Sequence, residues 1–260
     1  MRLTDFFSGF DGDDAMRRNV LVLARRAVVS AGMMMAAAAG SLAAQNLTVY
    51  GSAGVDGDET NIQLIGGTVR FGEAGWAPEV GLQGYHLGYD AGSDNRTVWA
   101  ITPSVGASYR MPVGQVGARV GYSFQSDDDG GVPVFEGEGG GSGVVATAQG
   151  NYWGSGPELQ GIASYNFGSD YIWTNAQALV PVAQMANGGR VSAGGEVVWQ
   201  GGTDSGAGNA IQLGPVVKLS TGHNFSVNAG AGWKHFGGGN DRDDTWYARI
   251  GAVKYGIRLF

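Results

Sequence analysis

Residues 98–110 read VWAITPSVGASYR, and large apolar side chains alternate there with small or polar ones. Trp99 and Tyr109 belong to the apolar set, whereas Ser104 and Arg110 belong to the polar set. Successive side chains of a β-strand point to opposite faces. The period of two therefore predicts a strand with one apolar face and one polar face.

The same alternation recurs along the chain from residue 46 onward. Clusters of Gly, Pro, Asn and Asp separate the alternating segments and indicate turns. They place strands near residues 46–55, 60–71, 77–89, 96–110, 115–126, 143–153, 158–167, 171–182, 190–200, 210–220, 224–235 and 245–259. The predicted fold class is therefore all-β, with about twelve antiparallel strands and with ten or fourteen as alternatives.

The connections between these strands alternate in length. Short ones fall at 72–75, 111–114, 154–157, 183–189 and 221–223, and mostly longer, acidic ones at 56–59, 90–95, 126–142, 201–209 and 236–244. Only the connection at 168–170 departs from this rule. Short periplasmic turns, longer extracellular loops and an even strand number are typical of an outer-membrane barrel. We expect a single antiparallel transmembrane β-barrel, and the alternative is a soluble sandwich with its apolar faces inside.

The composition narrows the function classes. The chain has 260 residues, 48 Gly, no Cys and a formal net charge of −7. The lack of Cys excludes a disulfide scaffold, a Cys-ligated zinc site and a thiol nucleophile. The acidic balance argues against nucleic acid as a partner. Charged residues make up only 15% of the chain, fewer than the exposed faces of a soluble sheet protein require.

The first 44 residues have the order of a secretory signal. Arginine pairs at 17–18 and 25–26 precede an apolar run at 27–39 and small residues at 40–44. This run is shorter than the roughly 20 residues of a membrane-spanning helix, so we expect cleavage after Ala43 or Ala44. Met16 is the expected start. The predicted domains are an N-terminal extension with signal peptide at 1–44 and an outer-membrane barrel at 45–260.

Aromatic residues gather near the predicted strand ends, where a membrane barrel carries its interface girdles. The predicted girdle comprises Tyr109, Tyr122, Phe124, Tyr152, Trp199, Trp233 and Trp246. These side chains would lie at the level of the lipid head groups. Outer-membrane lipid and lipopolysaccharide are therefore expected partners.

The last strand ends YGIRLF at 255–260 and resembles the C-terminal strand of Gram-negative outer-membrane β-barrel proteins. The resemblance implies that Phe260 is the signal for the barrel-assembly machinery, a partner during biogenesis. Arg258 departs from the pattern, because an apolar residue is expected there. The apolar phase also slips between Ala252 and Val253, which predicts a bulge.

Two internal stretches carry a narrower resemblance. DYIWTN at 170–175 and LGPVV at 213–217 are similar to the barrel protein associated with bacterial cellulose-synthesis operons. The similarity lies in the second half of the chain and brings no catalytic residues with it. It implies that components of surface-polysaccharide export are partners.

The ionisable residues on the polar faces bear most directly on function. Those expected to point into the lumen are Arg70, Arg110, Arg119, Arg190, Glu196, Lys218, Lys234 and Arg249. All but one are basic, so a water-filled lumen would favour anions. In a closed barrel the same groups would pair with Glu196 and backbone carbonyls, because isolated buried charges are costly. Twelve strands fall between filled and open barrels, and a narrow pore is slightly preferred.

Two further features indicate other chemistry. His235 lies near an extracellular strand end beside Trp233, where an outer-membrane lipid hydrolase would place a catalytic His, but no nucleophile motif such as G-x-S-x-G accompanies it. Asp127, Asp128 and Asp129 are candidate Ca²⁺ ligands, although the EF-hand spacing is not met and a solvated acidic loop is the commoner explanation. We expect no catalytic residue, no metal and no cofactor.

The sequence thus predicts a non-enzymatic barrel that acts as a narrow, anion-leaning channel or as an accessory to surface-polysaccharide, cellulose-like export. One alternative is a closed structural barrel that binds partners through its acidic extracellular loops. The other is an outer-membrane lipid hydrolase. These hypotheses place the functional residues in the lumen, in the loops or on the outer wall, respectively.

Overall fold

The computed structural model describes residues 45–57, 61–91, 94–127, 142–154, 156–186, 188–203, 209–221, 224–237 and 243–258. The expected signal peptide and start site lie outside these residues, as do Asp128, Asp129 and Phe260. Within the described ranges, no helix is long and apolar enough to cross a membrane.

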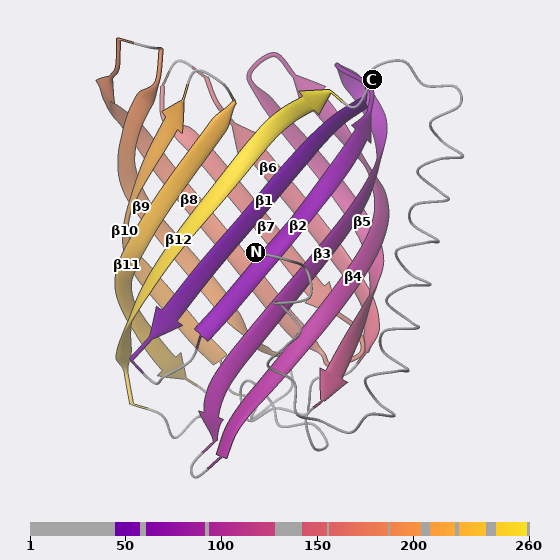
Figure 1. Cartoon of the computed structure of the whole chain (residues 1–260), viewed down its shortest axis with the longest axis vertical. Helices are drawn as coiled ribbons and strands as arrows, with labels where there is room; N and C mark the ends of the chain where they lie inside the picture. Colours follow the sequence, from indigo (N-terminus) through magenta and orange to yellow (C-terminus); the bar gives the residue numbers. More distant parts are fainter. Residues whose placement is uncertain are drawn as a thin grey trace, which may run out of the picture. The chain divides into compact units, whose positions relative to one another are not determined.

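Twelve β-strands run through the described residues. They are β1 (Gln45–Asp56), β2 (Asn61–Phe71), β3 (Gly75–Ala91), β4 (Asp94–Met111), β5 (Gly114–Asp127), β6 (Gly143–Tyr152), β7 (Glu158–Asn166), β8 (Tyr171–Gln184), β9 (Arg190–Gly202), β10 (Asn209–Thr221), β11 (Phe225–Gly237) and β12 (Thr245–Arg258). Each strand pairs antiparallel with its neighbours in the chain, and β1 pairs with β12, which closes the barrel (Figure 1). The predicted all-β barrel of twelve strands is confirmed, and the alternative counts of ten and fourteen are wrong.

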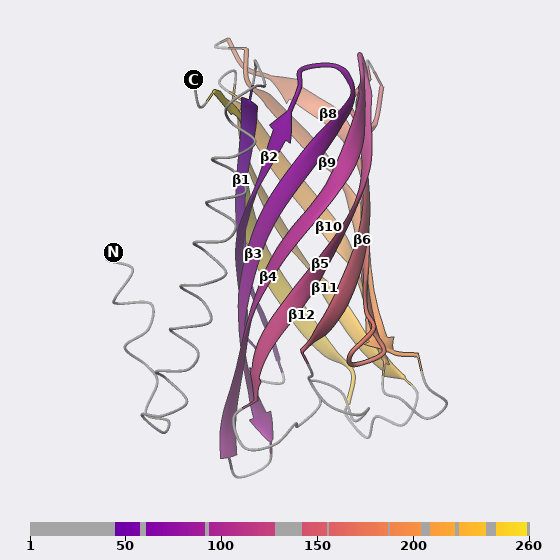
Figure 2. The ribbon, with the colours of Figure 1, turned by 90° about the vertical axis from the view of Figure 1, so that its right-hand side faces the viewer.

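The two rims of the barrel differ. At one rim, which we call the turn end, β1 begins and β12 ends, and Asn46 pairs with Arg258. At the opposite rim, the loop end, β3 and β4 reach furthest, because their pairing continues to Ala91 and Asp94 (Figure 2). The segment predicted as a loop at 90–95 therefore mostly extends this hairpin. Backbone pairing carries the two strands past the Asp and Asn residues that suggested a loop, although residues 94–97 are all polar and show no alternation.

The bulge predicted in the last strand lies at Tyr255–Gly256. One extra residue of β12 is accommodated there against Leu47 and Val49 of β1. Gly256 has a φ of 64°, a left-handed conformation that glycine adopts without a steric penalty. The bulge comes a few residues later than the change of apolar phase, so Tyr255 remains on the inner side, where it hydrogen-bonds Ser226.

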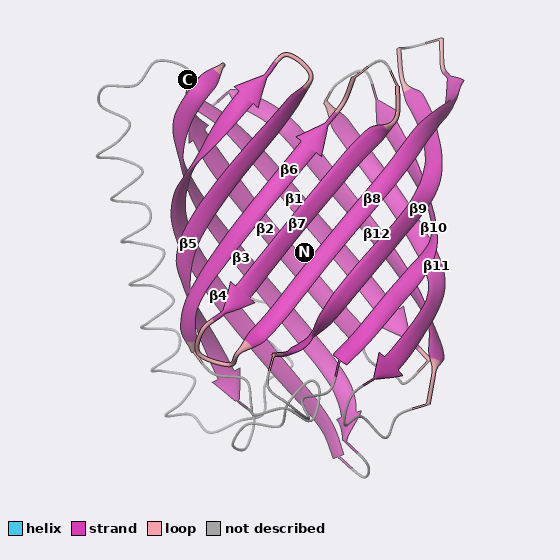
Figure 3. Ribbon diagram, turned by 180° about the vertical axis from the view of Figure 1, so that it is seen from behind, coloured by secondary structure: helices cyan, strands magenta, loops and turns pink. Residues whose placement is uncertain are grey.

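The outer face of the wall is apolar and the inner face is polar. Exposed outer side chains include Ile65, Val120 and Leu213, whereas buried inner ones include Gln177 and Ser192. The strands form one continuous tilted wall on both sides of the barrel (Figure 1, Figure 3). This sense of alternation is the reverse of that in a soluble sandwich and is that of a transmembrane barrel.

Candidate functional site in the barrel lumen

The eight residues predicted to line the lumen lie on the inner positions of seven strands: Arg70, Arg110, Arg119, Arg190, Glu196, Lys218, Lys234 and Arg249. Seven of them are brought together in three clusters and one ion pair, each centred on a carboxylate. Arg110 makes none of these carboxylate contacts and lies at the turn end, where it pairs with Gly75 of β3. Its guanidinium carbon is 5.9 Å from the centroid of the Trp153 ring.

The first cluster surrounds Glu196 of β9. Arg249 of β12 donates from Nε to Glu196 Oε1 at 2.7 Å and also from its terminal nitrogen to Oε2. The Tyr247 hydroxyl donates to Oε1 at 3.1 Å, and the amides of Asn175 and Gln177 lie 3.5 and 3.3 Å from Oε2. Four side chains from two other strands, β8 and β12, thus bind one carboxylate.

Glycine makes room for this cluster. A Cβ atom at Gly230 of β11 would lie only 2.5 Å from Glu196 Oε1 and 3.1 Å from a methyl group of Val216. Gly230 pairs with Arg249 on the neighbouring strand. The absence of a side chain at 230 therefore lets the carboxylate reach across to the guanidinium.

The second cluster surrounds Glu158 at the start of β7. Arg190 of β9 and Lys218 of β10 both form ion pairs with it, the latter at 2.7 Å. The hydroxyl of Ser192 donates to the same carboxylate at 3.1 Å. The cluster joins strands that are up to three positions apart in the wall, so the side chains reach into the lumen.

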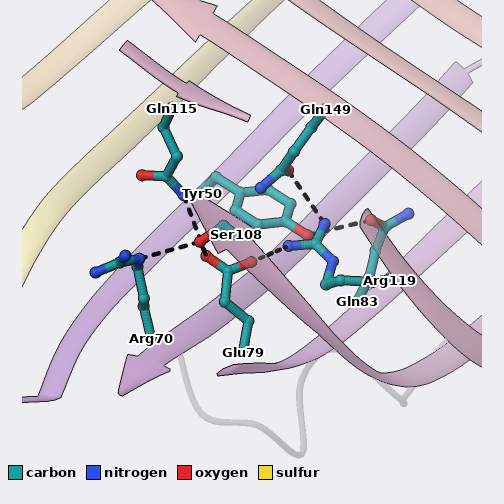
Figure 4. Close-up of polar contacts among 8 residues, drawn as sticks. All are labelled: Tyr50, Arg70, Glu79, Gln83, Ser108, Gln115, Arg119 and Gln149. Atoms are coloured by element: carbon teal, nitrogen blue, oxygen red, sulfur yellow. Dashed lines mark hydrogen bonds and ion pairs between the residues drawn. The ribbon is translucent and has the colours of Figure 1, made fainter. Parts of the chain in front are cut away.

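The third cluster surrounds Glu79 of β3 and is shown in Figure 4. The Ser108 hydroxyl donates to Glu79 Oε1 at 2.5 Å, and the Gln115 amide does so at 3.1 Å. Arg70 Nε donates to Ser108 Oγ at 3.0 Å. Arg70 also donates to the carbonyls of Gly72 and Gly75, so it holds the turn between β2 and β3.

Arg119 closes this cluster on the side of β5. Its guanidinium donates to Gln149 at 3.3 Å, and another of its nitrogens lies 3.8 Å from Glu79 Oε2 (Figure 4). Neither of the two facing atoms has a hydrogen-bond partner among the described residues. Beside them, the Tyr50 hydroxyl donates to Gln83 at 3.1 Å.

An ion pair between Lys234 of β11 and Asp56 of β1 completes the set. Both side chains are buried. Lys234 Nζ also lies 4.6 Å from the centroid of the Phe236 ring, within the range of a cation–π interaction. This pair lies towards the loop end, because Asp56 is the last residue of β1.

The predicted acid–base balance of the lumen was wrong. Sequence reasoning placed only Glu196 among the cations, whereas the structure adds Asp56, Glu79 and Glu158. Asp56 was assigned to a loop because it ends its strand. Glu79 and Glu158 each follow a proline, so they lie where a strand and a turn are hard to separate in the sequence. Each nevertheless shares its parity with a polar residue of its own strand, Gln83 and Gln160, respectively. That alternation could have identified both carboxylates as inner residues.

The charges differ in their exposure to the lumen. The side chains of Arg190, Arg249 and Lys218 are 34%, 20% and 16% exposed, whereas those of Glu158 and Glu196 are 8% and 0% exposed. The carboxylates of these two clusters therefore lie behind their cations. A solute in the lumen meets guanidinium and ammonium groups first.

His235 and Asp244 form a hydrogen-bonded pair at the loop end, outside the lumen. His235 Nδ1 lies 2.7 Å from Asp244 Oδ1, and the His235 side chain is 61% exposed. The hydrogen bond from His235, with further ones from the Phe236 amide and Trp233, lowers the pKa of Asp244. Among the described residues, His235 has no Ser or Thr hydroxyl partner, which a hydrolase of the serine type requires.

The described residues contain no group of three His, Asp or Glu side chains that is arranged to hold a metal ion. Asp127 ends β5, and the rest of the predicted Ca²⁺ candidates lie outside the described residues.

The seven predicted girdle residues lie on the outer face in two bands. Tyr109 and Tyr152 lie at the turn end, and the band at the loop end comprises Tyr122, Phe124, Trp199, Trp233 and Trp246. Trp76, which the sequence prediction missed, is 5.3 Å from Tyr109 between ring centroids. An apolar outer wall with an aromatic band at each rim and a polar lumen is the architecture of a bacterial outer-membrane barrel.

Comparisons with known proteins give matches of low similarity among solved structures. No family model matches the chain, and no curated protein is significantly similar in sequence. Among solved structures, an outer membrane channel from Pseudomonas putida F1 has a TM-score of 0.49 and 11% identity over 83% of this chain and 96% of that chain. The beta domain of the Bordetella autotransporter BrkA gives 0.47 and 13% over 81% and 98%. A bacterial polysaccharide outer membrane secretin gives 0.40 and 13% over 82% and 98%. At such low identity no activity can be transferred, so the function has to be derived from this chain's own residues.

Proposed function

We propose that the protein is a narrow outer-membrane pore that favours small anions. One observation carries the proposal: the cations of the Glu158 and Glu196 clusters are exposed to the lumen, whereas their carboxylates are covered. Water-accessible positive groups attract anions into a narrow channel. Arg190 and Lys218 lie near the turn end and Arg249 lies deeper, so the cations follow the length of one wall.

The paired carboxylates make the anion preference moderate. Each cation in these clusters is partly neutralised by a carboxylate within hydrogen-bond distance. The remaining electrostatic field acts at short range, because a unit charge and an ion 4 Å apart interact by only about 1 kcal/mol in water. A change of one lumen charge should therefore alter the anion-to-cation permeability ratio by roughly fivefold.

The test is the reversal potential of the purified protein in a planar lipid bilayer under a salt gradient. Arg190→Gln removes the most exposed cation of the Glu158 and Glu196 clusters and leaves Lys218 paired with Glu158, so it should lower the anion preference without unfolding the barrel. Lys254→Gln is the matched control, because Lys254 pairs with Phe225 on the outer face of the wall. Equal reversal potentials in the parent, Arg190→Gln and Lys254→Gln proteins would contradict the proposal.

A closed barrel that serves surface-polysaccharide export is the second candidate. It is favoured by the side chains that cross between distant strands, such as Lys218 with Glu158 and Arg249 with Glu196, since these contacts narrow the lumen. A folded protein that never conducts, together with loss of surface polysaccharide when residues 129–141 are deleted, would support this candidate. Steady conductance of the parent protein would exclude a closed lumen.

A further inference from the structure

The inner wall carries buried apolar residues at several levels, and those towards the loop end lie beside aromatic rings. Apolar residues occupy inner positions there, and each of them is at most 6% exposed: Leu87, Val98, Ala100, Val198, Ala210 and Phe236. Their burial means that neighbouring side chains cover them at this level.

Three of the inner residues form a row across neighbouring strands. Gln200 of β9 pairs with Ala210 of β10, which pairs with Phe236 of β11. Tyr171 of β8 packs against Ala210 and Phe236, and its hydroxyl donates to Gln200 at 3.3 Å. The Tyr171 ring therefore packs beside Ala210 and the Phe236 ring, and its hydrogen bond to Gln200 holds it there.

The opposite wall contributes to the same level. Tyr85 of β3 pairs with Ala100 of β4, which places its ring on the inner face. Strands β3 and β8 are five positions apart around a barrel of twelve strands. Aromatic side chains from nearly opposite walls therefore face the lumen towards the loop end.

The charges next to this level are neutralised. Lys234 lies two residues from Phe236 on the same strand, is paired with Asp56 and lies under the Phe236 ring. An ion that reached this point would find a compensated ion pair on one side and apolar or aromatic groups on the other. Neither replaces its hydration shell, so entry is costly.

We propose that Tyr85, Tyr171, Ala210 and Phe236, which we call the aromatic layer, form the permeation barrier of the pore. Narrow hydrophobic constrictions in channels block ions because water leaves them. The inference rests on the proposed pore and assigns ion selection and the permeation barrier to different parts of the lumen. The cations nearer the turn end select by charge, and the aromatic layer limits how many ions pass.

The test is the conductance of Phe236→Ala and Tyr171→Ala in the same bilayer. Each variant should raise single-channel conductance or open probability severalfold while leaving the reversal potential of the parent unchanged. Phe225→Ala, which shortens an exposed aromatic residue on the outer face, is the matched control and should behave as the parent. Tyr171→Phe removes the hydroxyl and keeps the ring, so it should retain the barrier. The heat-dependent gel mobility of each variant verifies that the barrel is folded.

The outcomes separate this inference from the proposed function. If folded Phe236→Ala and Tyr171→Ala both conduct as the parent does, the aromatic layer is not the barrier, whatever the reversal potentials show. If they conduct more strongly but Arg190→Gln leaves selectivity unchanged, the barrier stands and the anion preference falls. If the parent and both variants are silent, both proposals are overturned.

Discussion

Arg249 and Glu196 lie on strands three positions apart, yet the guanidinium binds both oxygens of a carboxylate that is wholly shielded from solvent. Such a pair fixes the distance between β9 and β12 through the lumen, and not only through the hydrogen bonds of the wall. Because Glu196 also accepts from Tyr247 and two amides, its charge is fully compensated.

Removal of one partner should therefore destabilise the barrel. We expect Arg249→Gln to lower the free energy of unfolding by about 3–5 kcal/mol, because it leaves a buried carboxylate without its cation. The double variant Arg249→Gln with Glu196→Gln should recover much of this loss. Urea unfolding in lipid vesicles measures the free energy of unfolding of the single and the double variant. A double variant that is no more stable than the single one would show that the pair is not coupled.

Gly230 supports the same cluster through its lack of a side chain. Gly230→Ala should push Glu196 away from Arg249 and cost about 1–3 kcal/mol, as overpacking does in other well-packed interiors. Gly195→Ala is the matched control, since the nearest atom to a Cβ there is 3.8 Å away. In thermal unfolding, Gly230→Ala should therefore be less stable than Gly195→Ala. Equal stability would mean that the cluster shifts without strain.

The twelve strands could be predicted because alternation survives even where turn residues interrupt it. The seven cations of the lumen were predicted, but only one of the four carboxylates around which most of them gather, since a carboxylate at a strand end, such as Asp56, looks the same in sequence as one in a loop. The apolar inner residues near the aromatic layer were missed for a related reason. Val98 and Ala100 share the parity of the polar residues that follow them, which marks them as inner residues, but with Trp99 between them they form a continuous apolar run in which no alternation is visible. Which distant strands meet in the lumen follows from closure of the barrel, and no local pattern encodes it.

The His235–Asp244 pair should make the start of the β11–β12 connection sensitive to acid. The folded-state pKa of Asp244 lies below its ordinary value, chiefly through the hydrogen bond from His235. A carboxylate with a lowered pKa contributes stability above its unfolded pKa and loses that contribution as the pH falls through the folded value. The Phe236 amide donates to Asp244, so its hydrogen-exchange protection should decline as the pH falls from about 5 towards 2. The Asp244→Asn protein should show no such decline beyond the intrinsic change in exchange rate, and an identical decline in both proteins would contradict the assignment.

The absence of Cys from the chain permits a direct test of which rim admits solutes. Ser52 lies on the inner side of β1, four residues from Asp56 towards the turn end, and is partly exposed. A charged thiol reagent should therefore label Ser52→Cys readily from the turn end and slowly from the loop end, because ions entering from the loop end must cross the aromatic layer. Labelling in intact cells reports the outer rim, and labelling after permeabilisation reports both. Adding Phe236→Ala should accelerate the reaction in intact cells, whereas Phe225→Ala should not. Rapid labelling of Ser52→Cys in intact cells with Phe236 in place would show that the barrier lies elsewhere along the lumen.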